Sequence, residues 1–168
     1  GAITEKAGYV VDTPDLTASA GTIIDLGSIV NQLVKVDVTK AGGNVTIGSG
    51  NGKNSDALTV ATADVVRGNL VITNYASEND AQKNSIVVAD KLQATGDIII
   101  TNQETDINLR SASSITSQYE NVNITSVANI NANGVINAAK AVDLKADEAI
   151  SVAGTIDAGT NANVNAGS

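Results

Sequence analysis

Short apolar stretches separated by polar residues run along most of this chain. Many of them are two apolar side chains flanking one residue that points the other way, as in residues 45–47, 70–72 and 98–100. This period of two is typical of a very short β-strand with one buried face. The residues between the stretches are mainly Gly, Asn, Asp, Ser and Thr, which form turns. The pattern therefore predicts an all-β chain of many short strands.

The apolar pattern repeats along the chain. Residues 120–139 and 140–159 align with a period of 20, and a third copy begins at residue 160. Upstream, a signature of Gly, then Asn or Asp, then apolar-x-apolar recurs, and the extra residues lie in the polar loops 48–56, 73–85 and 101–106. The resulting coil starts lie near residues 43, 68, 96, 120, 140 and 160. Repeats of this length with insertions confined to loops are typical of solenoids.

Each repeat contains three short strands and is about 20–28 residues long. Such coils stack with parallel strand pairing at about 4.8 Å, so the sequence predicts a parallel β-helix. An antiparallel sandwich or barrel is the alternative, but its strands would not repeat with a constant internal order. Residues 1–42 lack the signature, and we expect either irregular first coils or a capping region there. Residues 43–168 are predicted to be regular coils, continuous with that region in one domain.

The composition fits a stacked interior. The chain has no Phe, Trp, Met, His or Cys, and its only aromatic residues are three tyrosines. In a narrow prism, Val, Ile, Leu and Ala stack in register, whereas a Phe in one coil would demand room in its neighbours. The same absences exclude disulfides, thiol chemistry and His-based catalysis. Acidic residues outnumber basic ones 18 to 10, which argues against nucleic acid and anionic membrane surfaces as partners. The apolar runs are also too short for membrane insertion.

The repeats resemble those of filamentous-haemagglutinin-type proteins and of bacterial autotransporter passenger domains. The phrases that carry the resemblance are GNVTIGSG, GNLVITN, GDIIITN, ANINANGVINAA and AISVAGTIDAG. The resemblance implies a right-handed β-helical stalk of a secreted bacterial protein, located outside the cell or on its surface. It implies roles in adhesion, aggregation or biofilm formation. The expected partners are a host or bacterial surface protein, a glycan, or other copies of the chain. We also expect the chain to be either a segment of a longer stalk or a solenoid whose ends are covered by other copies.

Two apolar residues stand out at an outward position of the first strand. Val71 and Ile99 occupy a position that is polar in the flanking coils, and the loop that follows Val71 carries Tyr75, Glu78 and Asp80. One interpretation is a contact surface made by these five residues. The other is that loop 73–85 folds over the two apolar side chains. Function in solenoids often lies on such insertions.

Stacked polar residues are the second candidate feature. Asn123, Asp143 and Asn163 should align from coil to coil, as should Asn137 and Asp157. Stacked amides form hydrogen-bonded ladders that reinforce a coil. Calcium binding is the alternative, because Asp and Asn oxygens suit that ion. Residues 48–60 resemble a glycine-rich calcium-binding nonapeptide, but this motif acts as a stack of repeats and it occurs only once in the chain.

We expect no cofactor and no enzyme, because the carboxylates are scattered over turns rather than clustered on one sheet. A polysaccharide-acting β-helix enzyme is therefore a less favoured hypothesis. The other hypothesis is a self-assembling extracellular fibre subunit, because the open ends of a β-helix are exposed strand edges.

Overall fold

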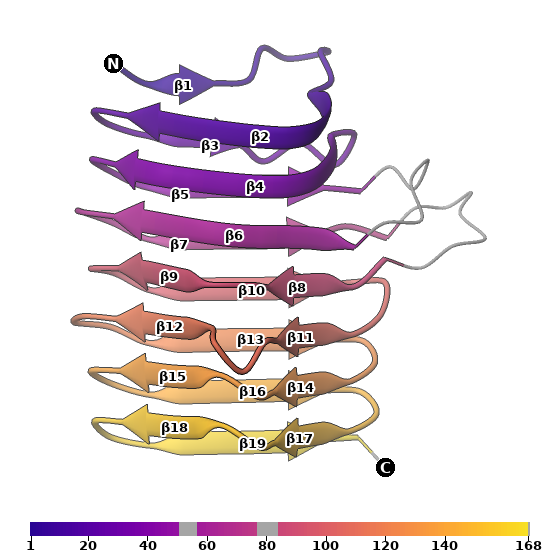
Figure 1. Cartoon of the computed structure of the whole chain (residues 1–168), viewed down its shortest axis with the longest axis vertical. Helices are drawn as coiled ribbons and strands as arrows, with labels where there is room; N and C mark the ends of the chain where they lie inside the picture. Colours follow the sequence, from indigo (N-terminus) through magenta and orange to yellow (C-terminus); the bar gives the residue numbers. More distant parts are fainter. Residues whose placement is uncertain (51–56, 77–83, 168) are drawn as a thin grey trace.

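The computed structural model describes residues 1–50, 57–76 and 84–167, and all regular structure within them is β-strand. The strands form two stacks of parallel strands, sheet A and sheet B (Figure 1). In the described residues, sheet A contains β1 (Ile3–Thr4), β3 (Ile24–Leu26), β5 (Val45–Ser49), β7 (Leu70–Asn74), β10 (Ile98–Asn102), β13 (Val122–Ser126), β16 (Val142–Ala146) and β19 (Ala162–Ala166). Sheet B contains β2 (Asp12–Ala20), β4 (Gln32–Ala41), β6 (Leu58–Val65), β8 (Ile86–Val88), β9 (Lys91–Ala94), β11 (Ile107–Leu109), β12 (Ser114–Ser117), β14 (Ile130–Ala132), β15 (Val135–Ala138), β17 (Ile150–Val152) and β18 (Thr155–Ala158).

The chain winds through about seven turns, each passing from sheet A to sheet B and back. In Figure 1 the strands of sheet B, nearer the viewer, point from right to left, and those of sheet A, behind them, point from left to right. The chain descends in the figure from its N-terminus. This winding is right-handed. The predicted parallel β-helix is therefore confirmed, and the antiparallel alternative is excluded by the parallel register of every strand pair described, for example Ile98 with Leu70 and Val122.

The Gly-Asx signature lies at the corner that precedes sheet A. Strands β7 and β10 begin at Leu70 and Ile98, two residues after the glycines of the signature, Gly68 and Gly96. Strands β5, β13, β16 and β19 begin at the same offset from the predicted starts. In residues 1–42, where the signature is absent, β1 and β3 nevertheless continue sheet A, and β2 and β4 continue sheet B. These residues form turns of the same solenoid.

The first three turns differ from the later ones in sheet B. From β8 onward each turn has two short strands there, as predicted, but β2, β4 and β6 are single longer strands. In the later turns a tight corner separates the two strands, and at Gly154 a Cβ would lie only 1.8 Å from the carbonyl oxygen of Gly134. In the early turns irregular register, such as the shift between Ala18 and Ser19, absorbs the bend instead. The long strands carry no glycine, but the corners between β8 and β9 and between β11 and β12 also form without one, so glycine alone does not divide sheet B.

The interior is a stack of aliphatic side chains. The inward residues of sheet A, among them Ile72, Ile100 and Ile124, are fully buried and lie in register on adjacent turns. The core continues from Ala18 to Ala146 and is formed by Ile, Leu, Val and Ala alone. Burial falls in the last turn, where Val152 is 43% exposed and Val164 48% exposed, because β17, β18 and β19 pair on one side only in the structure.

Candidate functional site

The outer face of sheet A holds the contact residues that the sequence suggested. Its side chains come from the second and fourth residues of each strand, and we call this surface the sheet A face. The second residues are Thr4, Asp25, Thr46, Val71, Ile99, Asn123, Asp143 and Asn163, and from β5 onward the fourth are Gly48, Thr73, Thr101, Thr125, Lys145 and Asn165. Val71 and Ile99 are half-buried and lie in register on adjacent strands. The structure thus brings these two side chains together near the middle of the face.

Tyr75 lies over glycines of the preceding turns. Its hydroxyl donates a hydrogen bond of 3.5 Å to the carbonyl oxygen of Gly27. A Cβ at Gly48 would lie 3.0 Å from the ring atom Cε2, so the ring rests where a larger residue would clash. Glu78 and Asp80 lie outside the described residues. The contact role of these residues, and the alternative that loop 73–85 covers Val71 and Ile99, therefore stay predictions.

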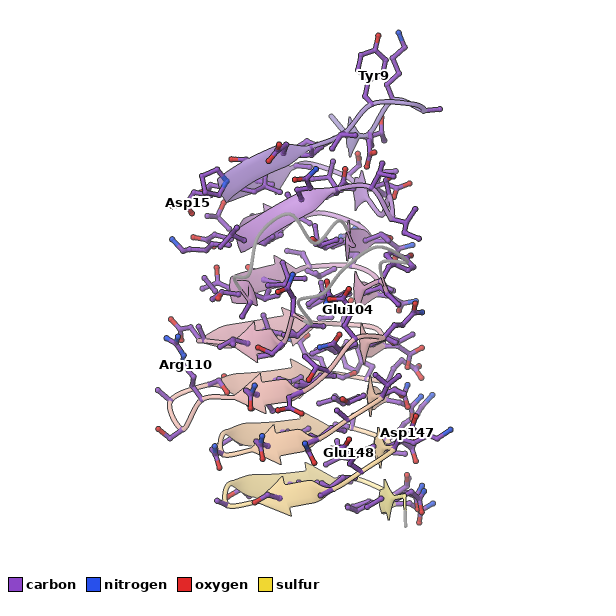
Figure 2. The ribbon with its side chains drawn as sticks, turned by 90° about the vertical axis from the view of Figure 1, so that its right-hand side faces the viewer. Tyr9, Asp15, Glu104, Arg110, Asp147 and Glu148 are labelled. Atoms are coloured by element: carbon purple, nitrogen blue, oxygen red, sulfur yellow. The ribbon has the colours of Figure 1, made fainter. Side chains whose placement is uncertain are left out.

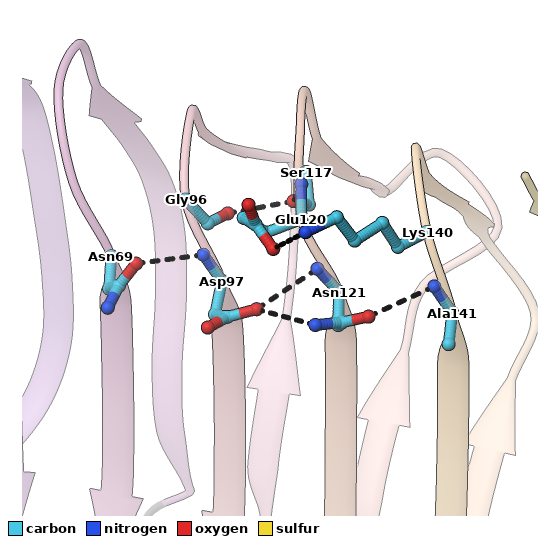
Figure 3. A network of polar contacts seen from close by, with 8 residues as sticks. All are labelled: Asn69, Gly96, Asp97, Ser117, Glu120, Asn121, Lys140 and Ala141. Atoms are coloured by element: carbon cyan, nitrogen blue, oxygen red, sulfur yellow. Dashed lines mark hydrogen bonds and ion pairs between the residues drawn. The ribbon is translucent and has the colours of Figure 1, made fainter.

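A ladder of Asn and Asp side chains connects the corners that precede sheet A (Figure 3). Asn44 Oδ1 accepts the backbone N–H of Asn69, and Asn69 Oδ1 accepts that of Asp97, at 3.0 and 2.9 Å. Asp97 Oδ1 accepts both the backbone N–H and the side-chain amide of Asn121, each at 3.0 Å. Asn121 Oδ1 then accepts the backbone N–H of Ala141 at 3.1 Å. We call this series the corner ladder; it ties one turn to the next through backbone donors.

A shorter series repeats this arrangement at the corners that precede β11, β14 and β17 in sheet B. Asp106 Oδ1 accepts the backbone N–H of Asn129 at 3.0 Å and its side-chain amide at 2.9 Å. Asn129 Oδ1 accepts the backbone N–H of Ala149 at 3.2 Å. The sequence contained the signal for the corner ladder, since its Asn and Asp residues are the second residues of the repeat signature. Alignment alone did not reveal that their side chains bond to the following turn.

The polar residues that were predicted to stack lie in register. Asn123 is beside Asp143, which is beside Asn163, and the Asn163 amide donates to Asp143 Oδ1 at 2.5 Å. Asn137 lies beside Asp157 on the outer side of sheet B. In the described residues no group of three or more His, Cys, Asp or Glu is placed to hold a metal ion. Most of the glycine-rich stretch 48–60 lies outside those residues.

A buried polar cluster at the end of β7 and β10 was not predicted. The side chains of Asn74 and Asn102 are buried, and Glu104, which is labelled in Figure 2, is only 7% exposed. Asn74 Nδ2 donates to Asn102 Oδ1 at 3.1 Å and to Glu104 Oε2 at 3.3 Å, and Glu104 Oε2 also accepts the backbone N–H of Asn84 at 3.0 Å. The cluster anchors Asn84, at the base of the longest loop. The sequence signal for this cluster was the Thr-Asn pair that ends both strands, at residues 73–74 and 101–102.

A second buried amide holds the N-terminal loop. Asn31 is fully buried; its Nδ2 donates to Glu5 Oε2 at 2.8 Å, and its Oδ1 accepts the backbone N–H of Val11 at 2.9 Å. The loop that starts at Glu5 borders a hollow of about 370 Å³ beside Asp25 and Thr46. Tyr9 rises from this end of the molecule (Figure 2). In the described part of the chain, no helix is long and apolar enough to cross a membrane.

No protein-family model, curated protein or solved structure matches this chain.

Proposed function

We propose that this chain is a structural and adhesive segment of a secreted bacterial surface protein, and that it takes part in adhesion, aggregation or biofilm formation. The observation that carries the proposal is the stack of about seven turns, each held to the next by backbone pairing and, from Asn44 to Ala141, also by the corner ladder. A stack of this kind resists bending and local opening because every inner strand is paired on both sides. Its work would be to hold outward loops and one sheet face at a fixed spacing.

The repeat phrases that resemble haemagglutinin-type stalks support an extracellular or cell-surface location. Partners of the proposed segment are a host or bacterial surface protein, a glycan, or other copies of the chain. The proposal gives the chain no catalytic role and no cofactor. The sheet A face is its most favoured contact surface, because Val71 and Ile99 place apolar groups outside the core where Asn123 and Asp143 stand in the following turns.

Adhesion can be measured with fluorescent microspheres that carry the chain. We expect these spheres to be retained on epithelial monolayers or on bacterial biofilms more strongly than spheres coated with serum albumin. The variant Val71→Ser/Ile99→Ser should reduce retention, whereas Val66→Ser/Val135→Ser, which changes exposed valines of other surfaces, should not. Retention equal to that of albumin on both surfaces would contradict the adhesive role.

A subunit of an extracellular fibre is the second candidate. It is favoured by the unpaired strand edges of β17, β18 and β19, beside which Val152 and Val164 are partly exposed. Exposed parallel edges are templates for further pairing. Light scattering should then show polymers that lengthen with protein concentration, and Val164→Lys should shorten them. A particle size that stays constant with concentration would contradict this candidate.

A further inference from the structure

The sheet A face has an uncharged centre, bordered by Asp25 on β3 at one end and by a pair of opposite charges on β16 at the other. From β5 to β13 the second and fourth residues are Thr, Val, Ile, Asn and Gly, although the chain carries a net charge of −8. The next strand, β16, presents Asp143 and Lys145, two residues apart on the same side. Asp143 is half-buried and Lys145 is exposed. Such a strand offers an acid and a base at about 7 Å from one another in a fixed order.

The order of these charges makes the face complementary to itself. We propose that two copies of this chain pair side by side, sheet A face against sheet A face, with their solenoid axes parallel and related by a two-fold axis along the solenoid. This operation reverses the strand direction of the second copy and keeps each turn opposite the same turn. The second residue of every strand then faces the fourth residue of the equivalent strand. Asp143 of each copy therefore meets Lys145 of the other.

The uncharged rows fit the same arrangement. Val71 faces Thr73 of the second copy, and Ile99 faces Thr101, so that β-branched side chains and their methyl groups meet across sheets about 10 Å apart. No charge is placed against an apolar residue in these rows. A pair with opposed solenoid axes would put second residues against second residues instead. Asp143 and Lys145 would then lose their complementary partners, so the charges favour the parallel pair.

The size of the face predicts a weak pair. Five strands at about 4.8 Å spacing and about 17 Å length cover roughly 400 Å² per copy, about half of what a standard stable interface buries. We expect dissociation constants above about 10 μM, which sedimentation equilibrium can measure at low ionic strength. The pairing uses the same face as the proposed adhesive contact, but it is measured on the chain alone in solution, so it can hold or fail whether or not coated microspheres are retained.

Charge exchange tests this geometry. Asp143→Lys and Lys145→Asp should each weaken self-association at least about tenfold, because like charges then meet twice in every pair. An equimolar mixture of the two variants should associate again. In that mixture, the lysine introduced by Asp143→Lys and the native Lys145 beside it both face aspartates of the other chain. The double variant Asp143→Lys/Lys145→Asp should pair like the wild type.

The control is Lys91→Asp, which makes the same charge change on sheet B and should leave association unchanged. Far-UV circular dichroism checks that each variant keeps its β-structure. A wild type that stays monomeric at about 1 mM would overturn the proposal. So would single variants that associate as well as the wild type, or a mixture that stays monomeric, because each of these places the contact away from Asp143 and Lys145.

Discussion

Replacing one stacked isoleucine with phenylalanine tests why the core has no large aromatic residues. Ile100 is fully buried in β10, and Ile72 and Ile124 lie in register on the turns before and after it. Adjacent turns are only about 4.8 Å apart, so a ring at this position has no free space along the solenoid axis. We expect Ile100→Phe to lower the free energy of unfolding by about 1–3 kcal/mol, the usual cost of overpacking a core.

Two further variants set the scale of that change. Ile100→Ala removes buried methyl and methylene groups and should cost about 2–5 kcal/mol. Val164→Phe places the ring in the same inward column but in the last turn, where the native side chain is 48% exposed and has a neighbouring turn on one side only. We expect Val164→Phe to change the free energy of unfolding by less than about 0.5 kcal/mol. The contrast between the two Phe variants isolates the effect of stacking.

Guanidinium unfolding followed by far-UV circular dichroism measures these differences through the shift of the midpoint. Hydrogen exchange of β7, β10 and β13 should show where the protection is lost, because in a solenoid the strain acts mainly on adjacent turns. If Ile100→Phe unfolds at the wild-type midpoint or above it, the interior accepts a ring. The absence of Phe and Trp would then need a cause other than stacking.

Three other substitutions test the polar contacts and the close corners. Asp97→Ala should cost about 1–2 kcal/mol in the same assay, because it removes the acceptor of two N–H groups of Asn121, and Asp97→Asn, which keeps an acceptor oxygen, should cost less than half of that. Asn31→Leu should speed hydrogen exchange in the first turn and leave the exchange of β16 unchanged. If the variant and the wild type exchange equally fast in the first turn, Asn31 does not hold the N-terminal loop. Gly154→Ala should lower the melting temperature, because its Cβ would lie 1.8 Å from a carbonyl oxygen, whereas Gly21→Ala, with nearest atoms 3.4 Å away, should not.

The repeat could be predicted because turn chemistry is local. A glycine followed by Asn or Asp marks the corner before sheet A, and the next apolar residue begins a strand, as at Gly68 and Leu70. The first two turns lack this signature because other residues form their corners. Ile24 begins β3 after Ile23 rather than after Asn or Asp. Their sheet B strands also continue without a break where the turns from β8 onward have a corner.

The polar contacts between turns were harder to predict than the strands. Asn74 and Asn102 looked like ordinary turn residues that follow a strand, yet they point inward and bond with Glu104. A sequence pattern assigns polar residues to the outside, so a buried polar cluster is visible only once its partners are placed. The corner ladder has the same character, because its acceptors bond to backbone N–H groups about 20–28 residues away, which any residue type can supply.

The inward and the outward residues of the solenoid are subject to different packing constraints. Each inward residue must fit against equivalent residues of two adjacent turns, so Ile72, Ile100 and Ile124 differ little. The outward residues meet no such limit, and yet the second position of sheet A changes from Val71 and Ile99 to Asn123 and Asp143 within three turns. Stacking does not require that change, since all four positions have the same backbone pairing. We therefore expect the change in the outward column to reflect the partner of this face, and the order of apolar, polar and charged rows would give the proposed pairing of two copies its register.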